Sequence, residues 1–321
     1  MITPKVFAGV DLGGTTINIG LVTKNGKIVA ENMCDSKIEN GVDDVLDRIT
    51  TIVRELLGSI SNQGVTEALG IGTAGKVDIK KGVLIEASNF PNWRNIHLRD
   101  ELKKRLCIPI FVDNDANVAA IGEHAYGAGR GVSEMLMVTL GTGVGGGLIL
   151  RGEIYRGTDG VAGEFGHTVI QQNGPICGCG RNGCVEAFIG TRGIIQNVRT
   201  RLESGRKSLL NNIESGKMTP KDISEAAQKG DTVAIEVFRD VGSYLGIALG
   251  NVANLLNIER VVVSGGVAKA GEFILKSARE TLSRTALKIP GETIQVHLST
   301  LGDRAGMVGA ARLAMLEGDP K

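Results

Sequence analysis

The sequence predicts an α/β protein built from two lobes. Helical and strand-like patterns alternate along the whole chain of 321 residues, which is typical of this class. One strand–turn–strand pattern also occurs twice, as "VDLGGTTINIGLV" at residues 10–22 and as "VTLGTGVGGGLIL" at residues 138–150, with Gly13 aligned on Gly141. No linker rich in Pro or Ser separates the two halves. We therefore expect two lobes with a central cleft.

The first half begins with three predicted strands between residues 5 and 33, and Asn25-Gly26 predicts a hairpin turn. Apolar residues at helical spacing predict a helix from Val42 to Leu56, and Gly58 is suited to cap its C-terminus. The later elements of this half are a strand at 68–78, a helix at 98–106, a strand at 108–115 and a helix at 116–127.

The second half begins at the repeated pattern and ends in a helix. Its predicted elements are strands at 134–140 and 147–150, a helix at 231–257, a strand at 260–266, a helix at 271–287, a strand at 293–299 and a final helix from Arg304. We assign residues 1–118 to a small lobe that the C-terminal helix 304–321 completes, and residues 119–303 to a large lobe.

Composition and charge argue against several classes of protein. The net charge of +1 and an aromatic content of 3% provide neither a basic surface nor many platforms for stacking nucleic-acid bases. The N-terminus begins a strand almost at once, where a secretion signal would need a basic segment and an apolar run. Five cysteines without such a signal predict reduced thiols. We expect a cytoplasmic protein that binds neither nucleic acid nor a membrane.

The two glycine turns are candidates for binding phosphate. "DLGGTT" and "GTGVGG" expose backbone N–H groups without bulky side chains, so a phosphate could approach closely. Asp11, at the entrance of the first turn, could hold a Mg²⁺ ion that bridges phosphate oxygens. Either turn alone could be a purely structural hairpin. Two copies, one in each half, favour a nucleotide gripped from both sides.

The second turn also matches the dinucleotide-binding pattern G-x-G-x-x-G, at Gly141, Gly143 and Gly146. That pattern requires a helix to begin directly after the glycines. Here the strand-like "GLIL" follows. The dinucleotide interpretation is therefore a minor alternative.

Polar residues follow the predicted strand at 108–115. A carboxylate at such a strand end, Asp115, could accept the proton of a substrate hydroxyl that attacks a γ-phosphate. Asn114 beside it could donate and accept hydrogen bonds, as sugar hydroxyls require, and Asn89 in the polar loop "SNFPNW" could reach the same cleft. The alternative for Asp115 is that it only caps the following helix.

Cysteines crowd the stretch "EFGHTVIQQNGPICGCGRNGCVE" at residues 164–186. Three Cys and one His would make a tetrahedral zinc site without an open position, and therefore a structural one. A disulfide would leave one Cys unpaired and needs an oxidising compartment, whereas a catalytic metal needs an open position. Structural zinc is the favoured interpretation, and it would hold Glu164 and Glu186 on a fixed loop.

The motifs "DLGGTT", "NDAN", "GTGVGGG", "GVAGEFGH" and "CGCGRNGC" together resemble the ROK family of bacterial sugar kinases and sugar-responsive repressors. The resemblance covers nearly the whole chain. It implies a two-lobed actin/hexokinase-like ATPase fold with ribonuclease H-like repeats.

The resemblance also implies roles for individual residues. It makes Asp115 the general base. The sugar contacts that it implies are Asn89, Asn114, Asp115, Glu164, His167 and Glu186. The zinc ligands are His167, Cys177, Cys179 and Cys184. The residues for Mg·ATP are Asp11, Gly13, Gly14, Thr15, Thr16, Thr142, Gly143, Gly265 and Gly266.

The leading hypothesis is an ATP-dependent glucokinase that phosphorylates the 6-hydroxyl of glucose, since "SNFPNWRNIHL" looks most like that branch of the family. Kinases for N-acetylmannosamine, N-acetylglucosamine, mannose or fructose are the alternatives. A repressor would carry a helix-turn-helix before the first glycine turn, and only ten residues precede Asp11. A sugar-binding scaffold would lack either Asp115 or an intact turn. We also expect a homo-oligomer, a dimer or a tetramer.

Overall fold

The computed structural model describes residues 5–60, 66–87, 89–214 and 216–318. Ser88, the first residue of the predicted polar loop, and residues 319–321, the end of the predicted last helix, lie outside the described residues. Contacts group the chain into two compact units, which are described separately below. Unit 1 comprises Met1–Ser133, Gly147–Gly163 and Ser299–Lys321, and unit 2 comprises Glu134–Gly146 and Glu164–Leu298.

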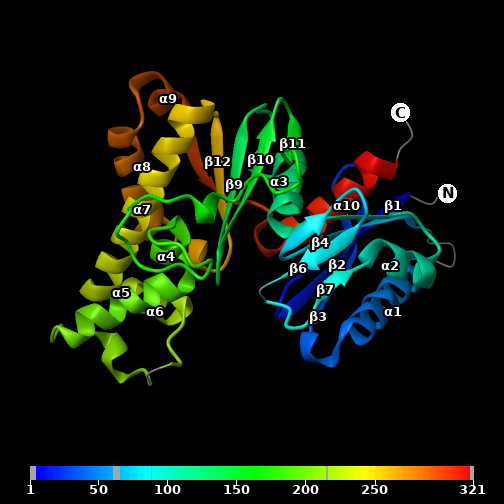
Figure 1. Cartoon of the computed structure of the whole chain (residues 1–321), viewed down its shortest axis with the longest axis horizontal. Coiled ribbons are helices and arrows are strands. Elements are labelled where there is room, and N and C mark those ends of the chain that lie inside the picture. The colour runs from blue at the N-terminus through cyan, green and yellow to red at the C-terminus, as the bar shows by residue number, and fades with distance from the viewer. Residues whose placement is uncertain (1–4, 61–65, 88, 215, 319–321) are drawn as a thin grey trace. The chain divides into compact units, whose positions relative to one another are not determined.

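Unit 1 is built on a five-stranded sheet with the order β3-β2-β1-β4-β8 (Figure 1). Its strands are β1 (Val6–Leu12), β2 (Thr16–Thr23), β3 (Ile28–Asp35), β4 (Thr66–Thr73) and β8 (Ile110–Asn114). The first three strands pair antiparallel, and the predicted turn between β2 and β3 is confirmed, with Gly26 at a φ of +83°. Strands β1, β4 and β8 are parallel neighbours.

This parallel core aligns the strand ends that carry the polar motifs. Asp11 pairs in register with Gly72, and Gly72 with Asp113. Parallel strands present their carboxyl ends at one edge of the sheet, where ligands of α/β proteins bind. The sheet therefore brings the first glycine turn and the "DNDAN" segment to the same edge.

Helices cover both faces of this sheet. They are α1 (Val42–Ile60), α2 (Leu98–Leu106), α3 (Asp115–Tyr126) and α10 (Ala305–Gly318). The buried face of α1, which includes Leu46, Ile49 and Val53, packs in the core over the sheet. The expected cap at Gly58 is wrong: α1 continues to Ile60, and the Gly58 backbone lacks the positive φ of a glycine cap. The packed apolar face outweighs the modest helix penalty of one glycine.

Helix α10 lies unusually close to the sheet and to α3, the helix that begins at Asp115. A Cβ atom at Gly70 would lie 1.8 Å from the Ala310 carbonyl oxygen, and one at Gly309 would lie 1.6 Å from that of Val118. Only glycine permits this approach. The C-terminal helix α10 therefore packs directly against α3.

Unit 1 also contains short strands at its periphery. A three-stranded antiparallel sheet consists of β5 (Lys76–Asp78), β6 (Val83–Glu86) and β7 (Arg94–Ile96). Strand β10 (Val144–Leu150) begins in unit 2 and ends in unit 1, where it pairs with β11 (Glu153–Tyr155). The sequence-based lobes assigned residues 119–133, 147–163 and 299–303 to the large lobe, whereas contacts place them in unit 1. The two units are groups of residues in contact and are not the lobes themselves, so the lobe boundaries stay a prediction.

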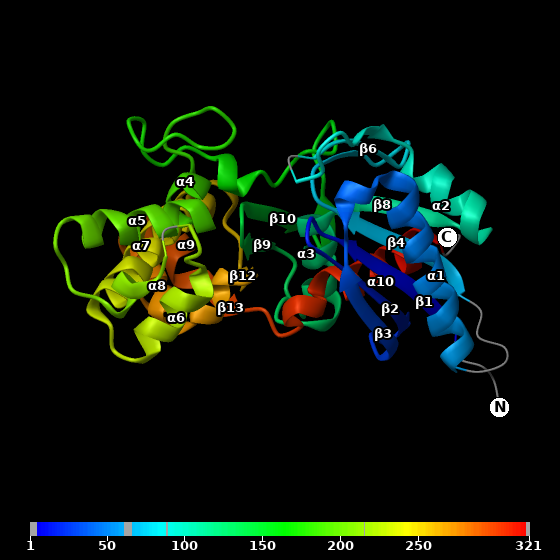
Figure 2. The same cartoon turned by 90° about the horizontal axis from the view of Figure 1, so that it is seen from below.

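Unit 2 contains parallel strands and most of the remaining helices. Strand β12 (Arg260–Ser264) pairs parallel with β9 (Met135–Leu140) on one side and with β13 (Gln295–Leu298) on the other. The helices are α4 (Val185–Ile189), α5 (Thr191–Glu203), α6 (Pro220–Gln228), α7 (Thr232–Leu256), α8 (Glu272–Thr285) and α9 (Lys288–Thr293). Helices α7 and α8 lie side by side in both views (Figures 1 and 2).

The predicted long helix, the strand after it and the next helix of unit 2 are confirmed as α7, β12 and α8. Helices α4, α5, α6 and α9 were not predicted. A signal for α6 existed, since Thr219 and Asp222 form a capping box around Pro220. Within the described ranges, no helix has both the length and the hydrophobicity that crossing a membrane requires.

Candidate functional site

The first glycine turn joins β1 to β2 and is exposed at Gly14 and Thr15. The Gly13 N–H donates to the Thr16 carbonyl at 3.0 Å, which closes the turn. A Cβ atom at Gly14 would lie 3.1 Å from the Asn89 Cβ. The structure thus places Asn89, a predicted sugar-binding residue, directly against the predicted phosphate-binding turn.

Two carboxylates influence each other at the same edge of the sheet. Asp11 is partly buried at the end of β1, and Asp115 begins α3. Burial, followed by the negative charge of Asp115, raises the pKa of Asp11 to about 7, against an opposing hydrogen bond from Asn18. Two interacting carboxylates with too little positive charge between them are the donor set that a hard cation such as Mg²⁺ prefers. The residues present therefore fit a divalent cation beside Asp11.

Asp113 is held in a network that leaves it no role as a base. It is fully buried, and its Oδ2 accepts from both Arg156 Nε and Nη2 at 2.8 Å. Its Oδ1 accepts from the Asn114 N–H at 2.7 Å and from Asn117 Nδ2 at 2.8 Å. These four donors hold the buried carboxylate in place, and it anchors the start of α3.

The cap of α3 is Asn114, so the simple cap alternative for Asp115 does not account for its position. Asn114 Oδ1 accepts from the N–H groups of Ala116 at 2.9 Å and of Asn117 at 3.4 Å. Asp115 is the first helical residue, and its Oδ1 accepts from the Ala116 N–H at 2.9 Å. The Asn114 amide donates one hydrogen to the Gly75 carbonyl at 3.2 Å. Its second amide hydrogen can serve a substrate.

The second glycine turn, in unit 2, joins β9 to β10. The Gly141 N–H donates to the Gly143 carbonyl at 3.0 Å, and Thr191 donates to the Gly141 carbonyl through its hydroxyl at 2.8 Å. Strand β10 continues from Val144, so the expectation that no helix follows these glycines is confirmed. The dinucleotide pattern has no structural support here.

Glu186 connects this turn to the cysteine segment. Its Oε2 accepts from the Val144 N–H at 3.0 Å, and a Cβ atom at Gly143 would lie only 2.6 Å from the same oxygen. Its Oε1 lies 3.4 Å from Cys177 Sγ. On the other flank of the segment, a Cβ atom at Gly166 would lie 2.0 Å from the Val144 carbonyl oxygen. Residues before and after the cysteines thus touch the same strand residue.

His167 and three cysteines converge on one point. The ligand atoms of His167, Cys177, Cys179 and Cys184 all lie within 4.8 Å of one another. Cys179 Sγ lies 3.7 Å from Cys184 Sγ, and Cys177 Sγ lies 3.7 Å from His167 Nδ1. In a tetrahedron with zinc–sulfur distances of about 2.3 Å, neighbouring sulfur atoms are roughly 3.8 Å apart. The four side chains therefore fit a closed zinc shell.

All five cysteines are free thiols, which argues against the disulfide interpretation. Hydrogen bonds from the backbone and side chain of Arg181 lower the pKa of Cys179 to about 6, which favours the thiolate that a metal binds. With Nδ1 of His167 facing Cys177, Nε2 of the same ring points away from the cluster. Glu164, which precedes this histidine, is exposed.

Gly265 and Gly266 follow β12 and lie beside the second turn. Ser264 pairs in register with Thr139 of β9. Gly265 has a φ of +96°, and a Cβ atom there would lie 2.2 Å from the Leu140 carbonyl oxygen, so only glycine fits. The predicted adenosine turn thus adjoins the strand that leads into the second glycine turn.

The predicted site residues fall into two groups, one in each unit. Unit 1 holds Asp11, Gly13, Gly14, Thr15, Thr16, Asn89, Asn114 and Asp115. Unit 2 holds Thr142, Gly143, Glu164, His167, Cys177, Cys179, Cys184, Glu186, Gly265 and Gly266. The sequence analysis missed Arg156, the cation that holds Asp113. A buried aspartate needs such a partner, but no local pattern identifies a residue 43 positions away.

Comparison with known proteins identifies relatives over nearly the whole chain. The model of the ROK family matches residues 7–317. A glucokinase of Thermotoga maritima is 36% identical over 97% of this chain and 98% of its own length. A ROK family glucokinase from Streptomyces griseus, solved with glucose and AMPPNP, is 35% identical, covers 97% of this chain and 99% of its own, and has a TM-score of 0.83.

A solved ROK family transcriptional regulator, a homolog of the E. coli MLC protein, is also similar. It is 27% identical, covers 98% of this chain and 79% of its own, and has a TM-score of 0.87. Kinases and regulators therefore share this fold, and fold similarity alone does not separate them. The matches show the predicted actin/hexokinase-like ATPase fold, and the chain belongs to the ROK family.

Proposed function

We propose that the protein is an ATP-dependent kinase that transfers the γ-phosphoryl group of ATP to the 6-hydroxyl of glucose. The observation that carries this proposal is the arrangement of Asp115, Asp11 and the exposed glycine turn at one edge of the parallel strands. The glucokinases of Thermotoga maritima and Streptomyces griseus support the sugar, because they cover nearly all of this chain at 36% and 35% identity.

Asp115 is the general base in this proposal. It would take the proton of the 6-hydroxyl as that oxygen attacks the γ-phosphorus, and the leaving group would be ADP. Asp113 is bound by Arg156 and Asn117, so the neighbouring aspartate is not available for the same task. The residues that would bind sugar hydroxyls in this proposal are Asn89, Asn114, Glu164, His167 and Glu186.

The glycine turns would bind the nucleotide. The N–H groups at Gly13 to Thr16, and those at Thr142 and Gly143, would donate to phosphate oxygens, and the turn at Gly265 and Gly266 would lie beside the adenosine. Mg²⁺, when bound near Asp11, would neutralise charge on the phosphates. Zinc, held by His167, Cys177, Cys179 and Cys184, would be structural, because four protein ligands leave no open position.

A regulator is the second candidate, because a solved transcriptional regulator of the ROK family shares the fold. A regulator must bind sugar but has no need to deprotonate a hydroxyl. Phosphoryl transfer needs a base, a cation site and turns for phosphate in one place. Asp115, Asp11 and Gly14 lie together at one strand edge, which favours the kinase.

The test is a hexose panel with ATP in a coupled assay for ADP release. Glucose, mannose, fructose, N-acetylglucosamine and N-acetylmannosamine are compared, and glucose should have the highest kcat/KM. A higher kcat/KM with another sugar would assign the protein to a different branch of the sugar kinases. Sugar binding by calorimetry without turnover of any sugar would replace the kinase with a sensor. Light scattering tests the proposed homo-oligomer, and cell fractionation tests the proposed cytoplasmic location.

A further inference from the structure

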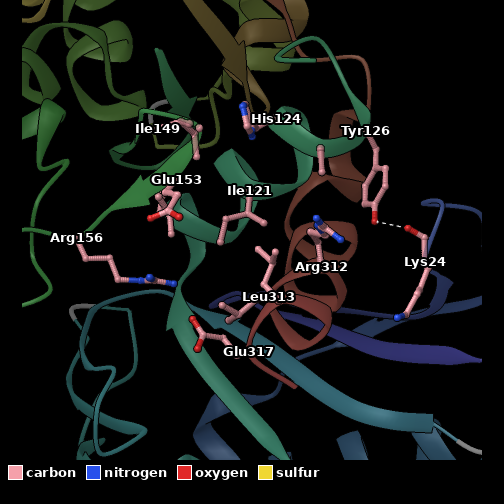
Figure 3. Close-up of a pocket in the computed structure, with 14 residues that line it drawn as sticks. Lys24, Ile121, His124, Tyr126, Ile149, Glu153, Arg156, Arg312, Leu313 and Glu317 are labelled. Carbon is pink, nitrogen blue, oxygen red and sulfur yellow. Dashed lines mark hydrogen bonds between the residues drawn. The ribbon is translucent and has the colours of Figure 1, made fainter. Parts of the chain in front are cut away.

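Unit 1 contains a cavity of about 620 Å³ that none of the predicted site residues lines (Figure 3). It lies among α3, β11 and α10, and the turn at Lys24 borders it. Its apolar lining includes Ile121, Ile149 and Leu313. The volume is within the range of small-molecule sites in proteins.

Arg312 of α10 is the unusual residue of this cavity. Its side chain is partly buried, and its guanidinium has no hydrogen-bond or ion-pair partner in the described part of the chain. Figure 3 shows the guanidinium between Ile121 and Tyr126. A guanidinium that is partly shielded from water and has no protein partner offers its N–H donors to an anion.

The remaining polar groups of the cavity indicate what kind of anion fits. Arg156 also lines the cavity and adds a second guanidinium to that of Arg312. Glu153 and Glu317 are exposed carboxylates on the same lining, where they can accept from hydroxyl groups. A phosphate monoester that carries hydroxyls, that is, a sugar phosphate, matches both sets of groups.

Arg156 connects the cavity to the start of α3. It lines the cavity and contacts Oδ2 of Asp113, two residues before Asp115, through both Nε and Nη2. Asp113 in turn accepts from the Asn114 N–H and from Asn117. A phosphate that draws Arg156 away would leave a fully buried carboxylate without its cation and would disturb this network.

We propose that this cavity is a regulatory site for a sugar phosphate, bound through Arg312, and that its occupancy lowers kcat through Arg156 and Asp113. In the proposed function the product belongs to this class of ligand. The binding site itself does not depend on that function. The lowering of kcat rests on it, so binding is measured without turnover.

The probe is radiolabelled glucose 6-phosphate in equilibrium dialysis, with unlabelled glucose and AMPPNP saturating the reaction site. The wild-type protein should still bind about one equivalent. Arg312→Gln should weaken this binding at least tenfold while kcat without added product is unchanged. Arg304→Gln is the matched control, because Arg304 precedes α10 and does not line the cavity. In kinetics, the part of product inhibition that glucose cannot overcome should disappear in Arg312→Gln alone.

Absence of binding with the reaction site filled would overturn the proposal, as would binding that Arg312→Gln does not weaken. Displacement by inorganic phosphate as effective as displacement by glucose 6-phosphate would rule out a sugar phosphate as the ligand class. A protein that binds the probe but turns over no hexose would leave this site intact and contradict only the proposed function and the effect on kcat. A thermal melt of Arg312→Gln that matches the wild type shows that the variant is folded.

Discussion

The two glycine turns share a sequence pattern but are held in different ways. The first turn, in unit 1, is closed by its own backbone, and the carboxylate beside it, Asp11, comes from the strand that leads into it. The second turn, in unit 2, receives its carboxylate from Glu186, 42 positions further along the chain. That carboxylate occupies the Val144 N–H and lies against Gly143.

This difference means that the second turn depends on the cysteine segment. Glu186 lies two residues after Cys184, and Gly166 lies directly before His167. Both touch Val144. A metal that fixes the segment would therefore fix the second turn as well, whereas the first turn has no such dependence. Four experiments test whether the two turns differ in this way.

We expect the largest loss of activity from a substitution of Asp115, which lies at the sheet edge beside the first turn. Asp115→Asn keeps the shape of the side chain and removes its basicity, so kcat should fall by roughly 10²–10⁴. Glucose affinity, measured by calorimetry, should change little. A variant with near wild-type kcat would show that Asp115 does not act as the base.

Loss of a zinc ligand should weaken the binding of both substrates. Wild-type protein should carry about one zinc per chain by elemental analysis, and Cys179→Ala should lose it. Displacing substrate-binding groups by about 1 Å can cost on the order of a hundredfold in rate. Because Glu186 holds Val144, we expect weaker binding of AMPPNP as well as weaker binding of glucose.

Added Mg²⁺ should not restore the Cys179→Ala variant. Cys107→Ala, which changes an exposed cysteine outside the cluster, is the control and should keep its zinc. A metal-free wild type with full activity, or a disulfide within residues 177–184, would contradict the structural zinc site.

Substitution of Glu186 tests most directly whether the two turns are held in different ways. In Glu186→Ala the Val144 amide loses its acceptor, and its hydrogen exchange should speed up by about tenfold or more. Exchange at Gly14 in the first turn should not change. Glu186→Gln retains an oxygen acceptor and should restore protection at Val144. Glu164→Ala alters the other acidic flank of the cysteine segment and serves as the control; faster Val144 exchange in that variant would mean that the turn does not depend on Glu186 specifically.

The smallest expected effect concerns the pH dependence of stability at the first turn. The pKa of Asp11 is about 7 in the folded protein, against an ordinary value of 3.8, so the folded state favours the protonated form. Ionisation of Asp11 therefore lowers the unfolding free energy of the ligand-free protein progressively as the pH rises from 4 to 7. Above pH 7 this loss of stability stays constant. Asp11→Asn should raise the unfolding free energy at pH 8 by on the order of 2 kcal/mol and have little effect near pH 4. Equal effects at both pH values in denaturant titrations would contradict the shifted pKa.

Much of this protein could be predicted from local patterns. Short strand-like segments and turn residues located β1, β2 and β3 and the Asn25-Gly26 turn between β2 and β3, because these signals are properties of a few adjacent residues. The repeated pattern located both glycine turns. The spacing of the cysteines and His167 predicted a cluster that the structure brings within 4.8 Å. Gly58 was misread as a cap because the packing of α1 is decided by residues elsewhere in the chain.

From the sequence alone we could predict the α/β class, the two turns, the strand-end carboxylates and the cluster of His167 with three cysteines. Each depends on residue types at short spacing. Only the tertiary structure decided which carboxylate is available. Asp113 and Asp115 look alike in the chain, but Arg156, 43 positions away, binds one of them. Likewise, the bond from Val144 to Glu186 depends on how distant segments pack, and local patterns carry no information about such contacts.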